Sequence, residues 1–229
     1  MISITLDDLE LYRLMRQRRA DNVAAVLCGL LIVMSGDASE FLSFIRNQFP
    51  GFTGHDLQHS WRVVSRIESI LTPTARNDLS SVEIFSLIVA AAFHDVGMIS
   101  SGITVSQVRD NHHLLSEQFL LDYMKNRLSL ISEYHQRLAP CIGFVAKAHG
   151  LAWDEMVASE LFKRPERIMG QQVRTNILAV LLRIGDLLDL DSERSCDALQ
   201  RHAAIYFADQ SARIHHSKHK HVDHHCCPS

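Results

Sequence analysis

The sequence predicts an all-α fold, built around a central helix that ends in a histidine–aspartate pair. Helical periodicity recurs along the 229 residues, and no stretch alternates apolar and polar side chains for long enough to make a strand. The segment from Val82 to Phe93 is apolar on nearly every face, which is typical of a helix at the centre of a domain. His94 and Asp95 follow it directly. A buried carboxylate is costly unless it is paired or binds a metal, so this pair needs partners.

The composition is that of an ordinary globular chain, with 47% hydrophobic and 21% charged residues. A net charge of −3 gives no general electrostatic reason to bind nucleic acid or an anionic membrane. Five cysteines without paired spacing do not indicate a disulfide framework, so we expect a reducing, cytoplasmic location. The apolar run of twelve residues over 23–34 is too short to span a bilayer, and we expect a core helix there and no membrane contact.

The helices can be placed in order along the chain. Thr5 caps the first, whose apolar stripe runs from Leu6 to Met15, and the next ends where Gly36-Asp37 breaks the pattern. Ser80 and Glu83 form a capping box that opens the central helix. Further helices are expected over residues 39–45, 54–71, 105–125, 128–138, 140–148, 153–161, 171–188 and 192–206.

Histidines and aspartates on three of these helices could meet in one metal site. His55 and His59 lie four residues apart and therefore share one helix face. His94 and Asp95 end the central helix, and Asp186 lies inside an otherwise apolar helix, where an unpaired carboxylate would be expensive. Imidazole and carboxylate ligands together suit Mn, Fe, Zn or Mg.

Some of these positions have alternatives. Asp189 and Asp191 could each replace Asp186 as a ligand, although Asp191 is better placed as a helix cap and Asp189 to face solvent or a basic partner. His94 and Asp95 taken alone would be better explained as a structural pair at a helix end. Trp61 is expected in the core rather than stacked on a substrate.

Three segments carry a resemblance to the HD-domain metal-dependent phosphohydrolases. They are FPGFTGHDLQHS at 49–60, FHDVGM at 93–98 and LRIGDLLDL at 182–190, with the ordered pattern H…HD…D. The first segment resembles the HD-CE type, which is often fused to an Hsp90-like ATPase domain. The resemblance extends over about residues 49–194.

The resemblance implies an all-α HD-domain helical bundle with the metal site between central helices, and one or two divalent metal ions as the cofactor. The implied ligands of the first ion are His59, His94, Asp95 and Asp186. Asp95 would bridge to a second ion. His112 and His149 are similar to the second-metal histidines of the family, and Arg109, His112 and Ser116 resemble its R-x-x-H-x-x-x-S segment. His113 competes with His112 by adjacency, and the spacing from Arg109 favours His112.

The resemblance also implies catalytic roles. His55 is similar to a histidine of the helical cyclic-nucleotide phosphodiesterases that protonates the leaving oxygen, a role that its near-neutral pKa suits. Asp95 would hold the ions at the reacting group. Met98 stands where cyclic-dinucleotide-cleaving HD proteins usually carry lysine. A phosphate-contacting cation would then come from Arg109 or Lys147.

The predicted function is a metal-dependent phosphohydrolase that hydrolyses a nucleotide or another phosphate mono- or diester through a metal-activated water. The expected partner is thus a small phosphorylated substrate. One alternative is an HD-type nuclease on single-stranded nucleic acid, against which the acidic net charge counts. Another is a non-catalytic sensory or regulatory module of a larger ATPase-linked protein, such as one with a fused or associated Hsp90-like ATPase domain.

No internal repeat, low-complexity linker or charge block marks a boundary within the chain. Residues 1–48 are expected to form N-terminal helices that pack on an HD domain of residues 49–208. Residues 209–229 form a histidine-rich tail, which we interpret as the stub of a truncated connection.

Overall fold

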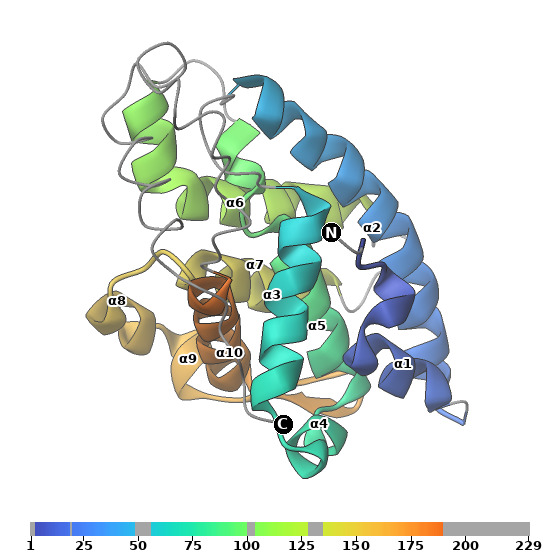
Figure 1. The fold of residues 1–229 in the computed structure, drawn as a ribbon. Coiled ribbons are helices and arrows are strands. Elements are labelled where there is room, and N and C mark those ends of the chain that lie inside the picture. The colour runs from blue at the N-terminus through green and yellow to red at the C-terminus, as the bar shows by residue number, and fades with distance from the viewer. Residues whose placement is uncertain (1–2, 19, 49–55, 100–103, 128–134, 190–229) are drawn as a thin grey trace.

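The computed structural model describes residues 3–18, 20–48, 56–99, 104–127 and 135–189, which form a helical bundle with one small β-hairpin (Figure 1). The predicted all-α fold is confirmed. The helices are α1 (Glu10–Gln17), α2 (Asn22–Gln48), α3 (Leu57–Ile70), α4 (Pro73–Asp78), α5 (Ser81–Phe93), α6 (Val105–Arg127), α7 (His135–Ala148), α8 (Trp153–Ala158), α9 (Glu160–Lys163) and α10 (Thr175–Leu188). The shorter elements are the 3-10 turns η1 (Leu6–Asp8) and η2 (Val96–Ile99) and the strands β1 (Glu166–Ile168) and β2 (Gln171–Val173).

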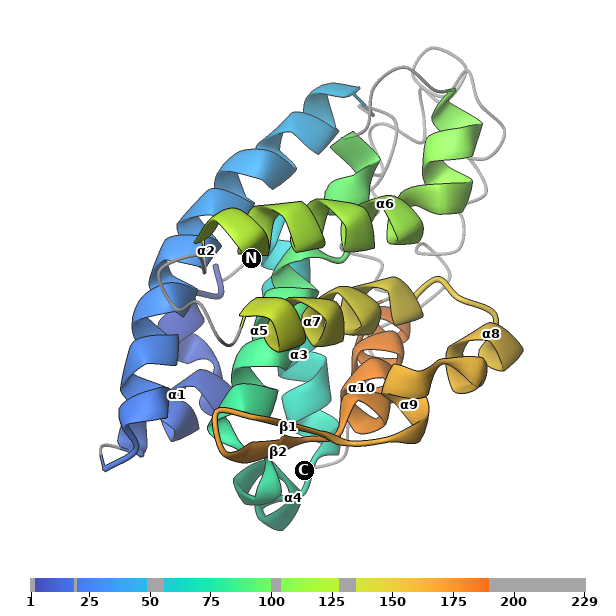
Figure 2. The same ribbon diagram turned by 180° about the vertical axis from the view of Figure 1, so that it is seen from behind.

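Helix α5 is the centre of the bundle, with α3 and α10 on one side and α6 and α7 on the other (Figures 1 and 2). Every residue from Ser81 to Phe93 is buried. The helix begins at the predicted capping box, in which the Ser80 hydroxyl accepts from the Glu83 amide and the Glu83 carboxylate accepts from the Ser80 amide. Because no face of α5 is polar, neighbouring helices can surround it completely.

The N-terminal helices share one hydrophobic core with the rest of the bundle, since buried residues of α1 and α2 belong to the same cluster as those of α3 and α5. The Glu68 carboxylate on α3 accepts a 2.8 Å hydrogen bond from the Leu11 amide in the first turn of α1. This amide is one of the donors that a helix start leaves unpaired, so α3 caps α1. On the other side, Tyr123 of α6 donates to Asp37 of α2 over 2.5 Å.

Helix α2 differs from the sequence prediction in length and in burial. It runs unbroken through Gly36-Asp37, where a break was expected. An exposed glycine costs a helix only about 1 kcal/mol, and the buried side chains of Met34, Ala38 and Leu42 hold the helix to the core on either side. The expectation of a core helix is only partly right, because 28% of the window Asn22–Ile45 is buried.

Two segments of the described chain are long and apolar enough to cross a membrane by length and composition, Asn22–Ile45 and Ser81–Ile99. The second is the core helix with its following turn and is 94% buried.

The hairpin between α9 and α10 is also a departure from the prediction, which placed a helix from residue 171. Strands β1 and β2 pair antiparallel, with Glu166 opposite Val173 and Ile168 opposite Gln171. The connecting Met169 and Gly170 both have positive φ, 52° and 74°, which gives a tight hairpin turn. Strands of three residues are too short for a recognisable alternation, so the sequence gives little sign of them.

Two further differences concern the second half of the chain. Helix α7 is continuous through Pro140, where the prediction placed a restart, and residues 128–134 of the expected helix 128–138 lie outside the described residues. The expected helix over 192–206 and the tail 209–229 also lie outside them. The expected helix over 153–161 is present as two short helices, α8 and α9.

Candidate metal centre

The six predicted ligand side chains come together where α5 and α7 end. They form two groups of three, whose nitrogen and oxygen atoms lie within 4.8 Å of one another in each group. The first group is His59 of α3, His94 and Asp186 of α10, and the second is Asp95, His112 of α6 and His149. Five separate segments of the chain therefore contribute to one small volume.

The first group has the spacing of ligands around a single cation. The Nε2 atom of His59 lies 3.3 Å from Nε2 of His94 and 3.4 Å from Oδ1 of Asp186. The Nε2 atom of His94 lies 3.7 Å from the same Asp186 oxygen. Nitrogen and oxygen ligands about 2.0–2.2 Å from an ion, at right or tetrahedral angles, are roughly 2.8–3.6 Å apart. The donor set fits a divalent cation.

The second group is joined to the first by Asp95. Its Oδ2 atom lies 3.1 Å from Nε2 of His94 and 3.5 Å from Nε2 of His59. Its Oδ1 atom lies 3.6 Å from Nε2 of His112 and 3.9 Å from Nε2 of His149. The two latter nitrogens are 2.9 Å apart. One carboxylate thus presents one oxygen to each group, the arrangement of a bridging ligand.

Three of the histidines are oriented by the backbone carbonyl three residues before them. The Nδ1 atoms of His94, His112 and His149 lie 2.8, 2.6 and 2.5 Å from the carbonyl oxygens of Ala91, Arg109 and Ala146. A carbonyl oxygen only accepts, so each Nδ1 carries the hydrogen and the neutral ring has its lone pair on Nε2. For α5 and α7 these are carbonyls of the last turn, which a helix leaves free.

The fourth histidine, His59, is oriented from a distant element. Its Nδ1 atom lies 2.7 Å from Oδ2 of Asp189, at the end of α10, and Oδ1 of Asp189 accepts from Nε of Arg62 over 3.1 Å. Asp189 is fully buried, so the expectation that it faces solvent is wrong, while the basic partner is present as Arg62. Such carboxylate–histidine pairs fix the tautomer and raise the basicity of a ligand.

The electrostatics favour positive charge in the centre. Burial lowers the pKa of His94, but Asp95 and Asp186 outweigh this and leave that pKa well above its usual value. Burial would raise the pKa of Asp186, yet two neighbouring imidazoles hold it well below its usual range. Burial and two neighbouring imidazoles lower the pKa of His149 to about 3, so its ring is neutral at physiological pH. The negative charge of Asp95 and Asp186 therefore favours either a proton on His94 or a metal cation in the centre.

A rigid contact holds the histidine–aspartate turn against α6. The hydroxyl of Ser116, fully buried, accepts from the Gly97 amide over 2.9 Å and donates to the His94 carbonyl over 2.6 Å. A Cβ atom on Gly97 would lie 2.1 Å from the His112 carbonyl oxygen. Only glycine permits this approach, which brings Asp95 and His112 within reach of one another.

The centre is unevenly exposed. The side chains of His59 and His94 are 2% and 1% exposed, whereas those of Asp186 and His112 are 28% and 21% exposed. Among the described ligands, the side of the centre nearest solvent is therefore that of Asp186 and His112.

The remaining predicted residues have different environments. Arg109 is half-buried one helical turn before His112. Lys147 is paired with Glu117 at 2.6 Å, so contact with a phosphate would require that pair to open. His113 packs beside Gly150 and belongs to neither group of three. His55 and Asp191 lie outside the described residues.

Two apolar residues near the centre are explained by packing. Met98 is buried in a small cluster with Leu42 and Ile45 of α2 and Val108 of α6. An ammonium group at this position would have to be buried among apolar side chains, at high cost. Trp61 is 2% exposed and belongs to the main core, as predicted.

A basic partner for Asp189 was one of its two predicted environments, but the contact of Asp189 with His59 was not predicted. A weak sign was present, because Asp189 shares a helix face with Asp186 three residues before it, and Arg62 shares one with His59.

Comparison with known proteins gives one match. No protein of curated function and no solved structure matches the chain. The profile of the HD-CE family matches residues 49–229, which is more than half of the chain and includes all six residues of the two groups. The chain therefore belongs to the HD-CE family of HD domains.

Proposed function

We propose that this protein is a metal-dependent phosphohydrolase that acts on a nucleotide or another small phosphate mono- or diester. The observation that carries the proposal is the Asp95 carboxylate, whose two oxygens face two separate groups of metal-capable ligands. Divalent ions bound there would lower the pKa of a water molecule and offset negative charge on a phosphoryl group.

The six ligand side chains would bind two ions. His59, His94 and Asp186 would hold one ion, His112 and His149 a second, and Asp95 both. The Nε2 atoms of His94, His112 and His149 are already directed inward by the Nδ1 hydrogen bonds. Metal binding would therefore need little movement of these rings, although His94 would have to release a proton. The buried wall at His59 and His94 would exclude bulk water, which strengthens electrostatic interactions within the site.

Two further residues would act on the substrate. His55 precedes His59 by four residues, and we propose it as the general acid that gives a proton to the departing oxygen. Arg109, one turn before His112, would contact a phosphate oxygen, a role that suits the planar and permanently charged guanidinium.

The test begins with metal content, measured by mass spectrometry on wild-type protein and on Asp95→Ala. Hydrolysis of bis-p-nitrophenyl phosphate and of a nucleotide panel is then measured on the same samples. We expect Asp95→Ala to lose most bound metal and on the order of a thousandfold in turnover. Asp110→Ala is the matched control, because Asp110 is an exposed carboxylate on α6.

A second matched pair separates neighbouring histidines. His112→Ala should lose one equivalent of metal, whereas His113→Ala should keep both, because the His112 ring lies near Asp95 and His113 belongs to neither group of three. Metal bound without turnover of any substrate would refute the enzyme and leave a metal-binding regulatory module. No bound metal after reconstitution would refute the metal centre itself.

A further inference from the structure

Helix α10 carries an exposed apolar surface on the side opposite its buried residues. We call this the α10 face; it consists of Ile177, Val180, Ile184, Leu187 and Leu188. Ile177, Ile184 and Leu187 are 39%, 38% and 58% exposed, and the other two are half-buried. Helix α10 lies between α3 on one side and α8 and α9 on the other (Figures 1 and 2). A helix that is apolar on its outer side as well as its inner side is expected to be covered by a further element.

The chain continues directly from α10 into a segment that could cover this face. Helix α10 ends at Leu188, and residues 190–229 lie outside the described part of the chain. The HD-CE profile extends over them to residue 229, so they belong to the same family domain. The sequence predicts a helix over residues 192–206, which only residues 189–191 separate from α10. Two helices joined by a loop of about three residues pack side by side and antiparallel.

We propose that residues 192–206 form a helix that packs antiparallel on the α10 face. The segment has an apolar side with the spacing of a helix–helix seam, at intervals of three, four and three residues: Cys196, Leu199, Ala203 and Tyr206. If the turn is centred on Leu190, Cys196 comes level with Ile184, and Ala203 comes level with Ile177. A large side chain then faces a small one at both levels, which allows close packing.

The charged flank of the segment matches the neighbouring helix α3. Arg62 and Arg66 are half-buried, lie one turn apart on α3, and Arg62 contacts Asp189 directly after the α10 face. Glu193 and Asp197 are also one turn apart, on the side of the predicted helix that the antiparallel arrangement turns toward α3. Two carboxylates would therefore lie beside two guanidinium groups. This complementarity favours the segment of this chain over an uncharged apolar partner.

The packing would also protect a contact behind the candidate metal centre, a consequence that rests on the proposed function. The side chain of Arg62 is 23% exposed, and its Nε atom donates to Asp189, which orients His59. A helix over Arg62 would keep water from this ion pair, and charge interactions strengthen where water is excluded. The segment would thus stabilise the orientation of His59 without itself contacting an ion.

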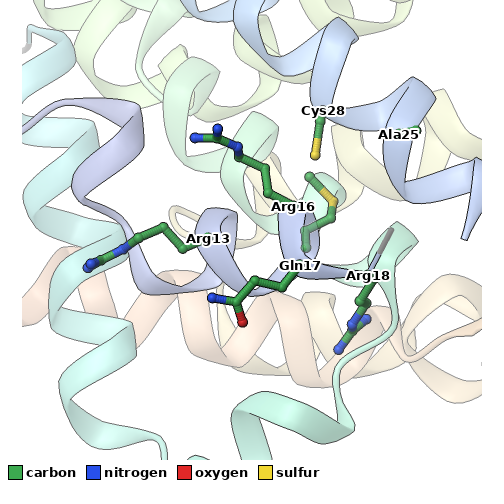
Figure 3. A pocket seen from close by; sticks show the side chains of 7 residues that line it. Arg13, Arg16, Gln17, Arg18, Ala25 and Cys28 are labelled. Carbon is green, nitrogen blue, oxygen red and sulfur yellow. The ribbon is translucent and has the colours of Figure 1, made fainter. Parts of the chain in front are cut away.

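A hollow of about 450 Å³ between α1 and α2 is a less suitable receptor for the segment (Figure 3). Helix α3 lies between α10 and α1 in both views of the fold. The lining of the hollow also includes three arginines and a glutamine, with Met15, Ala25 and Cys28 as its apolar part. The apolar side of residues 192–206 would find few apolar partners there.

Disulfide trapping in the full chain tests the packing, because Cys196 is already present at the level of Ile184. Ile184→Cys, in a background of Cys226→Ser and Cys227→Ser, should form an intramolecular disulfide with Cys196 under mild oxidation in most molecules. Two cysteines can be bridged only where their Cα atoms lie within about 7 Å. Leu114→Cys is the matched control, since Leu114 is 43% exposed on α6, and it should form no bond with Cys196. Peptide mass spectrometry identifies the pairs, and circular dichroism establishes that each variant is folded.

A second set of variants tests the register and the charge pairing. Ile177→Cys should form a disulfide with Ala203→Cys and none with Cys196. In the Ile184→Cys background, Asp197→Arg should lower the rate of disulfide formation roughly twofold to fivefold, the effect of losing an exposed ion pair. The double variant Arg66→Glu/Asp197→Arg should recover most of that loss.

A folded Ile184→Cys variant that forms no disulfide with Cys196, or forms it no faster than Leu114→Cys, would overturn the proposal. A bond between two separate chains would overturn it as well, and would assign the α10 face to a second copy. None of these variants changes a metal ligand, so a failure here leaves the proposed hydrolase activity untouched. Absence of metal or of turnover would likewise leave the packing intact.

Discussion

Replacing Gly97 by alanine should destabilise the protein and loosen its candidate metal centre, whereas the same replacement at Gly36 should stabilise it. A Cβ atom at Gly97 would lie 2.1 Å from the His112 carbonyl oxygen and 2.7 Å from the Ser116 amide nitrogen. Both are backbone atoms of α6 and cannot rotate away, so η2 and α6 must move apart. Overpacking of this kind costs about 1–3 kcal/mol, and we expect the upper end of that range.

Gly36 gives the matched control, because a Cβ atom there meets nothing within 4 Å and the position is exposed within a helix. Alanine should therefore add roughly 0.5–1 kcal/mol to the free energy of unfolding. For a chain of this size, Tm should fall by about 6–12 °C for Gly97→Ala and rise by about 1–4 °C for Gly36→Ala.

Metal stoichiometry gives the second measurement on Gly97→Ala. Separation of η2 from α6 moves His112 away from Asp95, so the second group of ligands should lose affinity more than the first. If Gly97→Ala has the same Tm as wild type and binds the same number of ions, then η2 and α6 do not approach each other as closely as described here.

Three further substitutions test separate contacts. Ser116→Ala should lower the free energy of unfolding, measured in urea, by about 2–4 kcal/mol, because it leaves a buried amide and a buried carbonyl without partners. The control Ser106→Ala changes an exposed serine and should lower it by less than about 0.5 kcal/mol. Equal urea midpoints for the two variants would contradict this. Asp189→Asn should weaken metal binding about 10–100-fold in calorimetric titration, because it removes the charge that makes the ligand histidine basic, and unchanged affinity would refute that role. Burial raises the pKa of Glu68 from 4.5 in the unfolded chain to about 7, so the protein takes up a proton on folding between these two pH values. The stabilisation from the protonated Glu68 is complete below pH 4.5 and is lost as the pH rises to about 7, which lowers the free energy of unfolding by about 3 kcal/mol. Glu68→Gln should abolish this pH dependence, and the same pH dependence in both proteins would count against it.

The elements with strong local signals could be predicted from the sequence. The start of α5 was found because Ser80 and Glu83 form a capping box whose contacts are local. The continuation of α2 through Gly36 could not be found, because the decision depends on tertiary packing of the residues on either side. The hairpin around Met169 escaped notice since its strands are short and its turn lacks the usual asparagine–glycine pair.

For the candidate site, the residues that converge were predicted and the residues that orient them were not. Asp95 and Asp186 could be chosen because a charge within an apolar helix is conspicuous in a sequence, whereas His59, His112 and His149 were assigned as ligands on the resemblance to the HD family. Asp189 is also an aspartate near the end of the same helix as Asp186, so only the three-dimensional structure distinguishes the environments of the two side chains. The tautomers of the ligand histidines are set by hydrogen bonds to backbone carbonyl groups. Every residue has such a group, so no sequence pattern indicates which one will be used.

The contact between His59 and Asp189 joins residues 130 positions apart, whereas the other three histidines are oriented by a carbonyl three residues away. Three imidazoles can thus adopt their working orientation as soon as their own helices form. The fourth must await the docking of α10 on α3, where Gly185 lies directly against Ile67. During folding, the pair His112–His149 should therefore be ready for a metal before the His59 group, and occupancy of the latter should report that the last helix is in place.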